Sequence, residues 1–119
     1  MKEFKGEQTV ARELVEATFD DAVLKNPKAV LVDFYATWCN PCVAQAPVLE
    51  KWAGANQAVV EVVKVNVDSA PTLAAKYGVM SIPTLVVFNG GQERGRAIGL
   101  QNEKALDGLI AKSGVKKTA

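Results

Sequence analysis

Apolar residues along the chain gather in short runs that polar, glycine-rich or proline-containing segments separate. Residues 29–36 form a nearly continuous apolar run rich in β-branched and aromatic side chains, and residues 59–67 form a second run. Such runs predict strands that are buried on both faces of a sheet. Between them, from Pro41 to about Gly54, small and apolar residues recur at helical spacing. Strand, helix and strand in this order predict a βαβ unit, in which a right-handed crossover joins two parallel strands.

Capping, turn and stop residues predict three further helices and a hairpin of two strands. The helices are expected near residues 18–26, 69–78 and 102–114, and the strands at residues 84–88 and 94–98. Thr18 and Asn102 are the expected N-caps of the first and last of these helices. Asn89-Gly90-Gly91 predicts the tight turn of the hairpin, which adds antiparallel strands. The predicted fold class is therefore α/β, with a mixed sheet covered by helices.

The length of 119 residues favours one domain, because domains commonly hold roughly 100–200 residues. We expect that domain at residues 9–114, with polar tails at residues 1–8 and 115–119. The net charge of +1 gives no reason to expect a nucleic-acid or anionic-membrane partner. No apolar run approaches the roughly 20 residues of a membrane span, and the charged N-terminus does not resemble a secretory signal, although a processed chain would look the same. A cytoplasmic protein without a membrane partner is therefore expected.

The counts of histidine and cysteine restrict the possible chemistry most. The chain has 0 His and 2 Cys, which excludes a Ser-His-Asp triad, a Cys-His pair and an imidazole metal site. Two cysteines are also too few for a small secreted scaffold held by several disulfides. Both lie in Trp38-Cys39-Asn40-Pro41-Cys42, after the first buried strand and at the start of the long helix. This position indicates function, since α/β sheets place their reaction sites at the carboxyl ends of strands.

The spacing of the two cysteines suits a redox-active pair. Residues i and i+3 at a helix start share a face, with Cα atoms about 5–6 Å apart, as a disulfide requires. Cys39 is expected to be exposed at the helix N-terminus, where free N–H groups and the helix dipole stabilise a thiolate. Cys42 lies one turn inside and is expected to be shielded. One sulfur of such a pair can attack a disulfide while the other resolves the product.

Three other interpretations of the pair stay open on the residues alone. A structural staple over so short a loop would contribute only roughly 2 kcal/mol of stability. A zinc site needs four ligands, so it would require a second chain or carboxylates. Two unpaired buried cysteines would need neither this spacing nor the intervening proline. The redox pair is favoured, with no metal and no cofactor beyond the reversible Cys39–Cys42 disulfide.

Two further residues near the pair carry candidate chemistry. Asp33 stands inside the first apolar run. A buried carboxylate is costly unless paired, so desolvation should raise its pKa, unless the side chain turns outward on an edge strand. Trp38 precedes the first cysteine and is expected to shield the sulfurs and meet the substrate, with an ordinary core position as the alternative.

Further segments accompany the Trp38–Cys42 motif: Leu31-Val32-Asp33-Phe34-Tyr35-Ala36, Pro47, Lys64-Val65-Asn66-Val67-Asp68, Ser81-Ile82-Pro83-Thr84 and Gly99. Through these segments the chain resembles the thioredoxin family from about Val10 to Ser113. The resemblance implies a four- to five-stranded mixed sheet flanked by about four helices. It also implies protein disulfide reductase activity by dithiol–disulfide exchange.

The resemblance further implies roles for individual residues. Cys39 would be the nucleophile, Cys42 the resolving thiol and Asp33 the group that handles the proton of Cys42. Lys64 would be the basic partner of Asp33, although an exposed strand lysine is the alternative. A substrate groove with a cis proline is expected from Trp38, Asn40, Pro41, Ile82, Pro83, Ile98 and Gly99. The resemblance also implies that the chain is a monomer. Its implied partners are disulfide-containing substrate proteins and a separate thioredoxin reductase or equivalent electron donor.

Some positions depart from the family pattern, and these departures affect the expected redox potential and choice of partner. Asn40 replaces a common glycine, Tyr35 a frequent tryptophan and Val43 a basic residue, and Met80-Ser81 replace a basic residue and a glycine. Loss of a cation weakens thiolate stabilisation, whereas Asn40 could add a hydrogen bond.

The direction of the exchange depends on the residue before the second cysteine. Strong oxidants of this superfamily tend to carry a histidine there, and this chain carries Pro41. A reductase is therefore favoured over a thiol-disulfide oxidase or isomerase. The non-enzymatic alternative is a binding module that acts independently of its redox state, which the intact cysteine pair with Asp33 disfavours.

Overall fold

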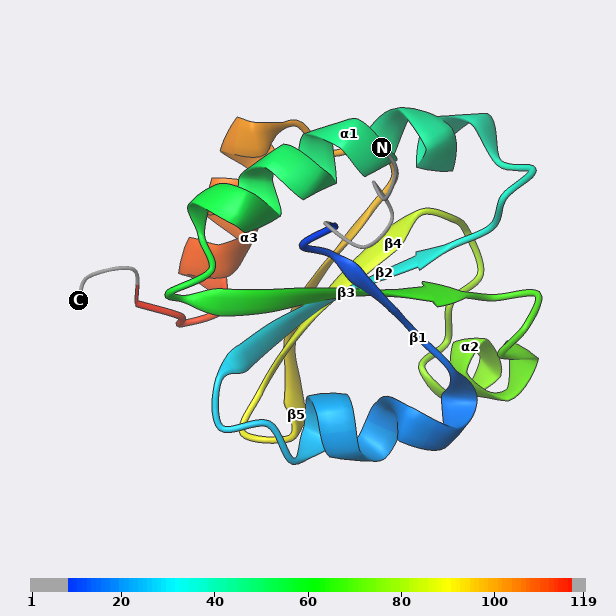
Figure 1. Cartoon of the computed structure of the whole chain (residues 1–119), viewed down its shortest axis with the longest axis horizontal. Coiled ribbons are helices and arrows are strands. Elements are labelled where there is room, and N and C mark those ends of the chain that lie inside the picture. The colour runs from blue at the N-terminus through cyan, green and yellow to red at the C-terminus, as the bar shows by residue number, and fades with distance from the viewer. Residues whose placement is uncertain (1–8, 117–119) are drawn as a thin grey trace, which may run out of the picture.

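The apolar run that begins at Ala29 forms the middle strand of a five-stranded sheet (Figure 1). The structure, a computed structural model, describes residues 9–116. The sheet has the order β1-β3-β2-β4-β5. Its strands are β1 (Arg12–Leu14), β2 (Ala29–Tyr35), β3 (Val60–Asn66), β4 (Thr84–Asn89) and β5 (Gln92–Ile98). β1, β3 and β2 are parallel, whereas β4 and β5 run antiparallel to their neighbours, which confirms the predicted mixed α/β sheet.

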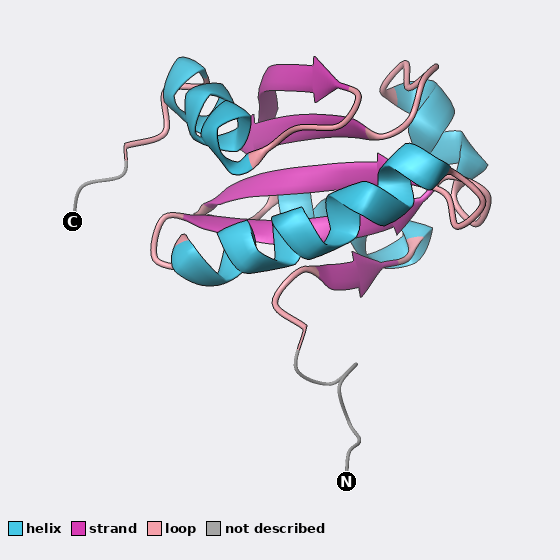
Figure 2. Cartoon of the chain, turned by 90° about the horizontal axis from the view of Figure 1, so that it is seen from above, coloured by secondary structure: helices cyan, strands magenta, loops and turns pink. Residues whose placement is uncertain are grey.

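Helices cover both faces of this sheet (Figures 1 and 2). One face carries α1 (Asn40–Ala55) and α3 (Glu103–Lys112). The other carries α2 (Pro71–Lys76) and two short helices, η2 (Glu16–Thr18) and η3 (Asp20–Leu24). Each face has its own apolar core, because successive side chains of a strand point to opposite sides.

The strand β2 contributes to both cores. Leu31 is buried in the cluster that contains Trp52 of α1, whereas Val32 is buried in the cluster that contains Phe19. Burial on both faces explains why this strand reads as a continuous apolar run rather than as an alternation of apolar and polar residues.

The chain before β2 differs from the prediction. Thr18 is not an N-cap: it is the last residue of η2, a 3₁₀ turn, and its hydroxyl donates a hydrogen bond back to the carbonyl oxygen of Val15. The following η3 is a π-helix without a side-chain cap. Asn26 follows the helical segment as expected, and its amide donates to the carbonyl oxygen of Ala22 and to Glu61.

The ends of the other elements match the prediction closely, with two exceptions. The edge strand β1 was not predicted, because its sequence Arg12-Glu13-Leu14 has no apolar alternation and it is held by pairing with β3. β5 begins at Gln92, two residues earlier than expected. The prediction of tails at residues 1–8 and 117–119 lies outside the described residues, while Val115 is partly buried against the core on the α1 and α3 face.

The sheet topology brings two distant loops together. β2 ends at Tyr35, and α1 begins five residues later at Asn40. β4 runs antiparallel to β2 with Phe34 opposite Thr84, so the loop before β4 lies beside the loop after β2. The candidate active site is at this edge.

Candidate active site

The two cysteines form a disulfide at the start of α1. Cys39 is the N-cap residue of the helix, with extended backbone, and Pro41 lies in the first turn. The Cα atoms of Cys39 and Cys42 are 5.2 Å apart, and the backbone N–H of Cys42 donates to Sγ of Cys39 at 3.2 Å. That N–H is one of the unpaired donors of a helix N-terminus, so it also stabilises a thiolate on Cys39 once the disulfide is reduced.

Both cysteines are shielded in the disulfide form, so the expected exposure of Cys39 is wrong for this state. Cys39 is 5% exposed and Cys42 is 4% exposed. Tyr35, Val67 and Ile82 pack against the small cluster that the two cysteines form with Ala36. The sequence showed which sulfur begins the helix but not the loops that fold over it.

The loop before β4 lies against the first sulfur. The Ile82–Pro83 peptide bond is cis, as the resemblance implied, and the carbonyl oxygen of Ile82 is 3.7 Å from Sγ of Cys39. The N–H of Gly99 donates to the carbonyl oxygen of Pro83 at 2.8 Å. This bond connects the end of β5, where Ile98 is exposed, to the loop beside the disulfide.

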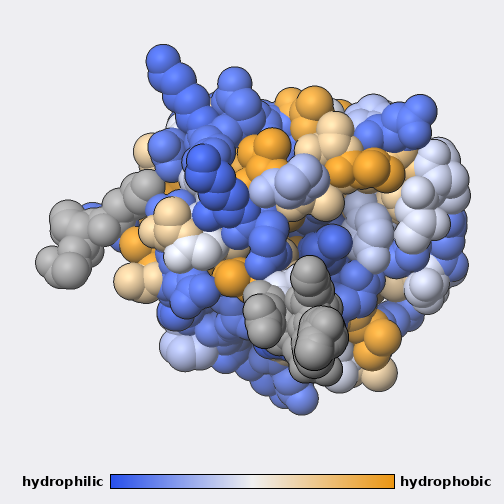
Figure 3. All heavy atoms as spheres, turned by 45° about the horizontal axis from the view of Figure 1, so that its top comes forward, coloured by the Kyte–Doolittle hydropathy of each residue, from blue (hydrophilic) through white to orange (hydrophobic). Residues whose placement is uncertain are grey.

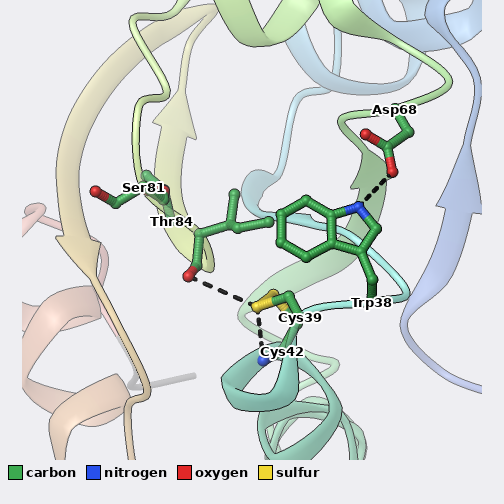
Figure 4. The surroundings of a disulfide bond; sticks show 7 residues. Trp38, Cys39, Cys42, Asp68, Ser81 and Thr84 are labelled. Atoms are coloured by element: carbon green, nitrogen blue, oxygen red, sulfur yellow. Dashed lines mark hydrogen bonds between the residues drawn. A yellow bond between two sulfur atoms is a disulfide. The ribbon is translucent and has the colours of Figure 1, made fainter.

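Trp38 is largely exposed beside the disulfide, which answers the alternative of an ordinary core position. Its side chain is 68% exposed, and Nε1–H donates to Oδ2 of Asp68 at 2.7 Å. Figure 4 shows the indole directed toward Asp68. Asn40 and Pro41 are exposed on the first turn of α1.

Asp33 is buried beneath the disulfide-bearing turn rather than turned outward. It is 1% exposed, and its Oδ1 atom has no hydrogen-bond partner among the described residues. Desolvation raises the pKa of Asp33 to about 7; the charge of Lys64 opposes this rise and that of Glu13 adds to it. Lys64 lies directly opposite Asp33 in the β2–β3 register, so it is the nearest cross-strand cation rather than an unrelated surface lysine.

A hollow of about 240 Å³ connects Asp33 with the second cysteine. Its lining residues are Asp33, Tyr35, Ala36, Thr37, Cys42, Val43, Ala46 and Lys64. The carboxyl group of Asp33, the sulfur of Cys42 and the side chain of Lys64 therefore border one space, through which a proton can pass by way of solvent.

Three residues of this region were not found from the sequence. Asp68 holds Trp38, and Glu13 of β1 accepts a hydrogen bond from the Tyr35 hydroxyl at 2.5 Å. Gln45 is fully buried in α1 and exchanges two hydrogen bonds with the backbone of Gln101, which fixes the loop after Gly99. A buried glutamine on an otherwise apolar helix face was the one available signal; the other two contacts depend on tertiary structure.

Within residues 9–116 no group of three or more His, Cys, Asp or Glu side chains is placed to hold a metal ion. In the same part of the chain, no helix is long and apolar enough to cross a membrane.

A cysteine pair at a helix N-terminus, beside a cis proline and above a buried carboxyl group, defines a thiol–disulfide oxidoreductase. The profile of the thioredoxin family matches residues 10–112. The chain belongs to the thioredoxin family and has its fold, and its activity is the reduction of protein disulfides by dithiol–disulfide exchange through the Cys39–Cys42 pair.

Named relatives agree with this assignment. A thioredoxin of Alicyclobacillus acidocaldarius is 45% identical over 98 residues, which cover 82% of this chain and 92% of the relative. A thioredoxin of Streptomyces clavuligerus is 46% identical over 97 residues, covering 82% and 90%. A bifunctional thioredoxin reductase/thioredoxin of Mycobacterium leprae is 44% identical over 97 residues, which are 82% of this chain but 21% of that protein.

Proposed function

We propose that Cys39 is the attacking nucleophile of the exchange reaction and Cys42 the resolving thiol. The proposal rests on one observation: the Cys42 N–H at the start of α1 points at Sγ of Cys39. A helix N-terminus favours negative charge, so it lowers the pKa of the thiol that it faces. No comparable donor faces Sγ of Cys42 among the hydrogen bonds of the described residues.

The exchange proceeds in two balanced steps. The Cys39 thiolate attacks one sulfur of the substrate disulfide; that S–S bond breaks, and its other sulfur leaves as a thiolate that takes up a proton. The Cys42 thiolate then attacks Sγ of Cys39, which breaks the mixed disulfide and releases the second substrate thiolate. The substrate has gained two electrons, and the pair has become the Cys39–Cys42 disulfide present in this structure.

We assign to Asp33 the role of accepting the proton of Cys42 before the second step. The hollow that both residues line and the pKa of about 7 support this role, because such a carboxyl group is partly ionised at neutral pH. Lys64, opposite Asp33 in the sheet, stabilises the ionised form.

The substrate is proposed to bind as an extended segment across the surface around the disulfide. This surface contains the exposed residues Trp38, Asn40, Pro41 and Ile98 and the partly exposed residues Ile82 and Gly99, while Pro83 of the predicted groove is buried. Met80, 94% exposed, and exposed Val43 extend it with apolar side chains. Figure 3 shows that apolar surface on the face crossed by α1 occurs in patches among polar residues. These exposed apolar side chains favour apolar segments next to the substrate disulfide.

Sustained turnover requires that a separate reductase return electrons to the pair. The name of the Mycobacterium leprae relative, a bifunctional thioredoxin reductase/thioredoxin, supports a thioredoxin reductase as the class of electron donor. A monomer in a reducing compartment such as the cytoplasm fits this role, because the glutathione and reductase systems there keep thiols reduced.

Cys42→Ser is the decisive variant. In this variant Cys39 can still attack, but nothing resolves the product. A covalent mixed disulfide with a substrate such as insulin should therefore accumulate, and the substrate thiol held in it should be released only on addition of dithiothreitol. Non-reducing electrophoresis and mass spectrometry detect the adduct. Cys39→Ser is the matched control and should form none. Steady turnover by Cys42→Ser without an adduct, or an adduct on Cys42 in the Cys39→Ser control, contradicts the assigned order.

A further inference from the structure

Glu13 on the edge strand β1 lies in one row with the two charged residues of the site. Glu13 is opposite Lys64 in the β1–β3 register, and Lys64 is opposite Asp33 in the β2–β3 register. Residues opposite each other in neighbouring strands point to the same face of the sheet. In this row one carboxyl-bearing residue therefore lies on each side of Lys64.

Tyr35 contacts two members of this row, Glu13 and Lys64. Its hydroxyl donates to Oε1 of Glu13 at 2.5 Å, and Nζ of Lys64 lies 4.8 Å from the centre of its ring. The Tyr35 side chain thus reaches across β3 over Lys64 and is tied down on β1. The same side chain lines the hollow shared by Asp33 and Cys42.

We propose that Glu13 is a positioning residue of the redox site: held by Tyr35, it shares the charge of Lys64 with Asp33 and so sets the pH range in which Cys42 resolves the mixed disulfide. This inference rests on the proton role proposed for Asp33. Glu13 itself contacts neither the cysteines nor the hollow.

The surroundings of Asp33 support this role. Glu13 faces it from β1, Lys64 from β3 and Tyr35 from its own strand, while α1 contributes Cys42 and apolar side chains and β4 contributes Leu85. Within this set, Lys64 lowers the pKa of Asp33 and Glu13 raises it.

The hydrogen bond and negative charge of Glu13 also act on Tyr35. Burial raises the pKa of Tyr35 well above its ordinary value, and the hydrogen bond to Glu13 and its negative charge raise it further. The phenol therefore stays neutral and continues to donate to Glu13 throughout the physiological pH range.

The expected size of the effect follows from the sheet spacing. Glu13 and Asp33 are separated by two inter-strand steps of about 4.8 Å each. Loss of the Glu13 charge should therefore lower the titration midpoint of Asp33 by about 0.3 pH units for an effective dielectric constant of about 80, and by about 1.3 pH units for one of about 20. Glu13→Gln removes the charge but keeps an amide oxygen that can accept from the tyrosine hydroxyl. Glu16→Gln, at an exposed position just after β1, is the matched control for charge alone.

The test uses the full chain and two readouts. Carbon NMR of the Asp33 carboxyl group gives its midpoint in the reduced protein, and stopped-flow kinetics give the pH profile of mixed-disulfide resolution. Glu13→Gln should move both to lower pH by the same amount, and Glu16→Gln should move neither. Tyr35→Phe should give a smaller shift in the same direction by releasing Glu13, and the double variant should shift no further than Glu13→Gln.

The outcomes separate this inference from the proposed function. An Asp33 midpoint that is unchanged or higher in Glu13→Gln overturns the role of Glu13 and leaves the exchange chemistry intact. A midpoint that moves while the resolution profile does not shows that Asp33 is not the proton acceptor of Cys42. Additive shifts in the double variant overturn the role of Tyr35 as the anchor of Glu13.

Discussion

Asp33→Asn should stabilise the protein at neutral and alkaline pH, because the native fold holds this carboxyl group in a costly place. The pKa of Asp33 is about 7 in the fold against an ordinary value of 3.8. Between these two values the native state keeps a proton that the unfolded chain has released. Stability therefore falls as pH rises from about 4 to about 7, and then levels off.

The magnitude follows from that difference. Each pKa unit corresponds to about 1.36 kcal/mol, so a rise of roughly 3 units costs about 4 kcal/mol of folding free energy above pH 8. Asparagine is nearly the same size and does not titrate. The gain in unfolding free energy of the variant should hence be near zero below pH 4 and grow to about 4 kcal/mol above pH 8. Loss of the carboxylate partner of Lys64 reduces this gain.

Urea unfolding followed by tryptophan fluorescence at pH 4 to 9 measures this gain, on oxidised protein so that the disulfide is constant. Asp20→Asn, at an exposed position, is the matched control for loss of a surface carboxylate, and its effect on stability should be much smaller than that of Asp33→Asn. A difference for Asp33→Asn that is independent of pH, or that is largest in acid, would refute the placement of a desolvated titrating carboxyl group at this position. The same variant should resolve mixed disulfides more slowly, since it has no proton acceptor.

Two further predictions concern how the fold supports the site. Gly91→Ala should lower the thermal unfolding midpoint more than Gly90→Ala does. Both glycines have positive φ, but a Cβ on Gly91 would lie 2.9 Å from the carbonyl oxygen of Leu24, whereas nothing lies within 4 Å of a Cβ on Gly90. Equal unfolding midpoints for the two variants would contradict this prediction. Gln45→Ala should lower the free energy of unfolding in urea by about 2–4 kcal/mol, because it removes a buried side chain and its two hydrogen bonds to the backbone of Gln101. Gln101→Ala keeps these two bonds and should cost less than about 1 kcal/mol; similar costs for the two variants would show that the Gln45 amide does not hold this loop.

Features with strong local signals were predictable from the sequence. The continuous apolar runs gave β2 and β3, and Asn102 caps α3 by accepting from the N–H of Ala105. The Cys39–Cys42 spacing at a helix start gave the disulfide and its Cα separation. Each of these depends on neighbours within a few positions of the chain, so the residue pattern contains the information.

The features that were missed depend on contacts between distant segments. β1 has three residues and exists because β3 offers it an edge, so no periodicity within Arg12–Leu14 could reveal it. Asp68 holds Trp38 from 30 positions away. The shielding of Cys39 likewise arises from Ile82, on a loop that only the antiparallel pairing of β4 with β2 brings near.

Local contacts and contacts between distant segments affect different parts of the site. The proposed nucleophile, Cys39, lies at the start of α1, so changes at Asn40 or Val43 should act on its thiolate through local donors and charges. The proposed proton acceptor, Asp33, lies in a row of residues across β1, β3 and β2, so a change at Glu13 should act on it from outside the motif. On these proposals, separate parts of the sequence govern thiolate stability and the pH response of resolution, and either can change while the cysteine motif stays the same.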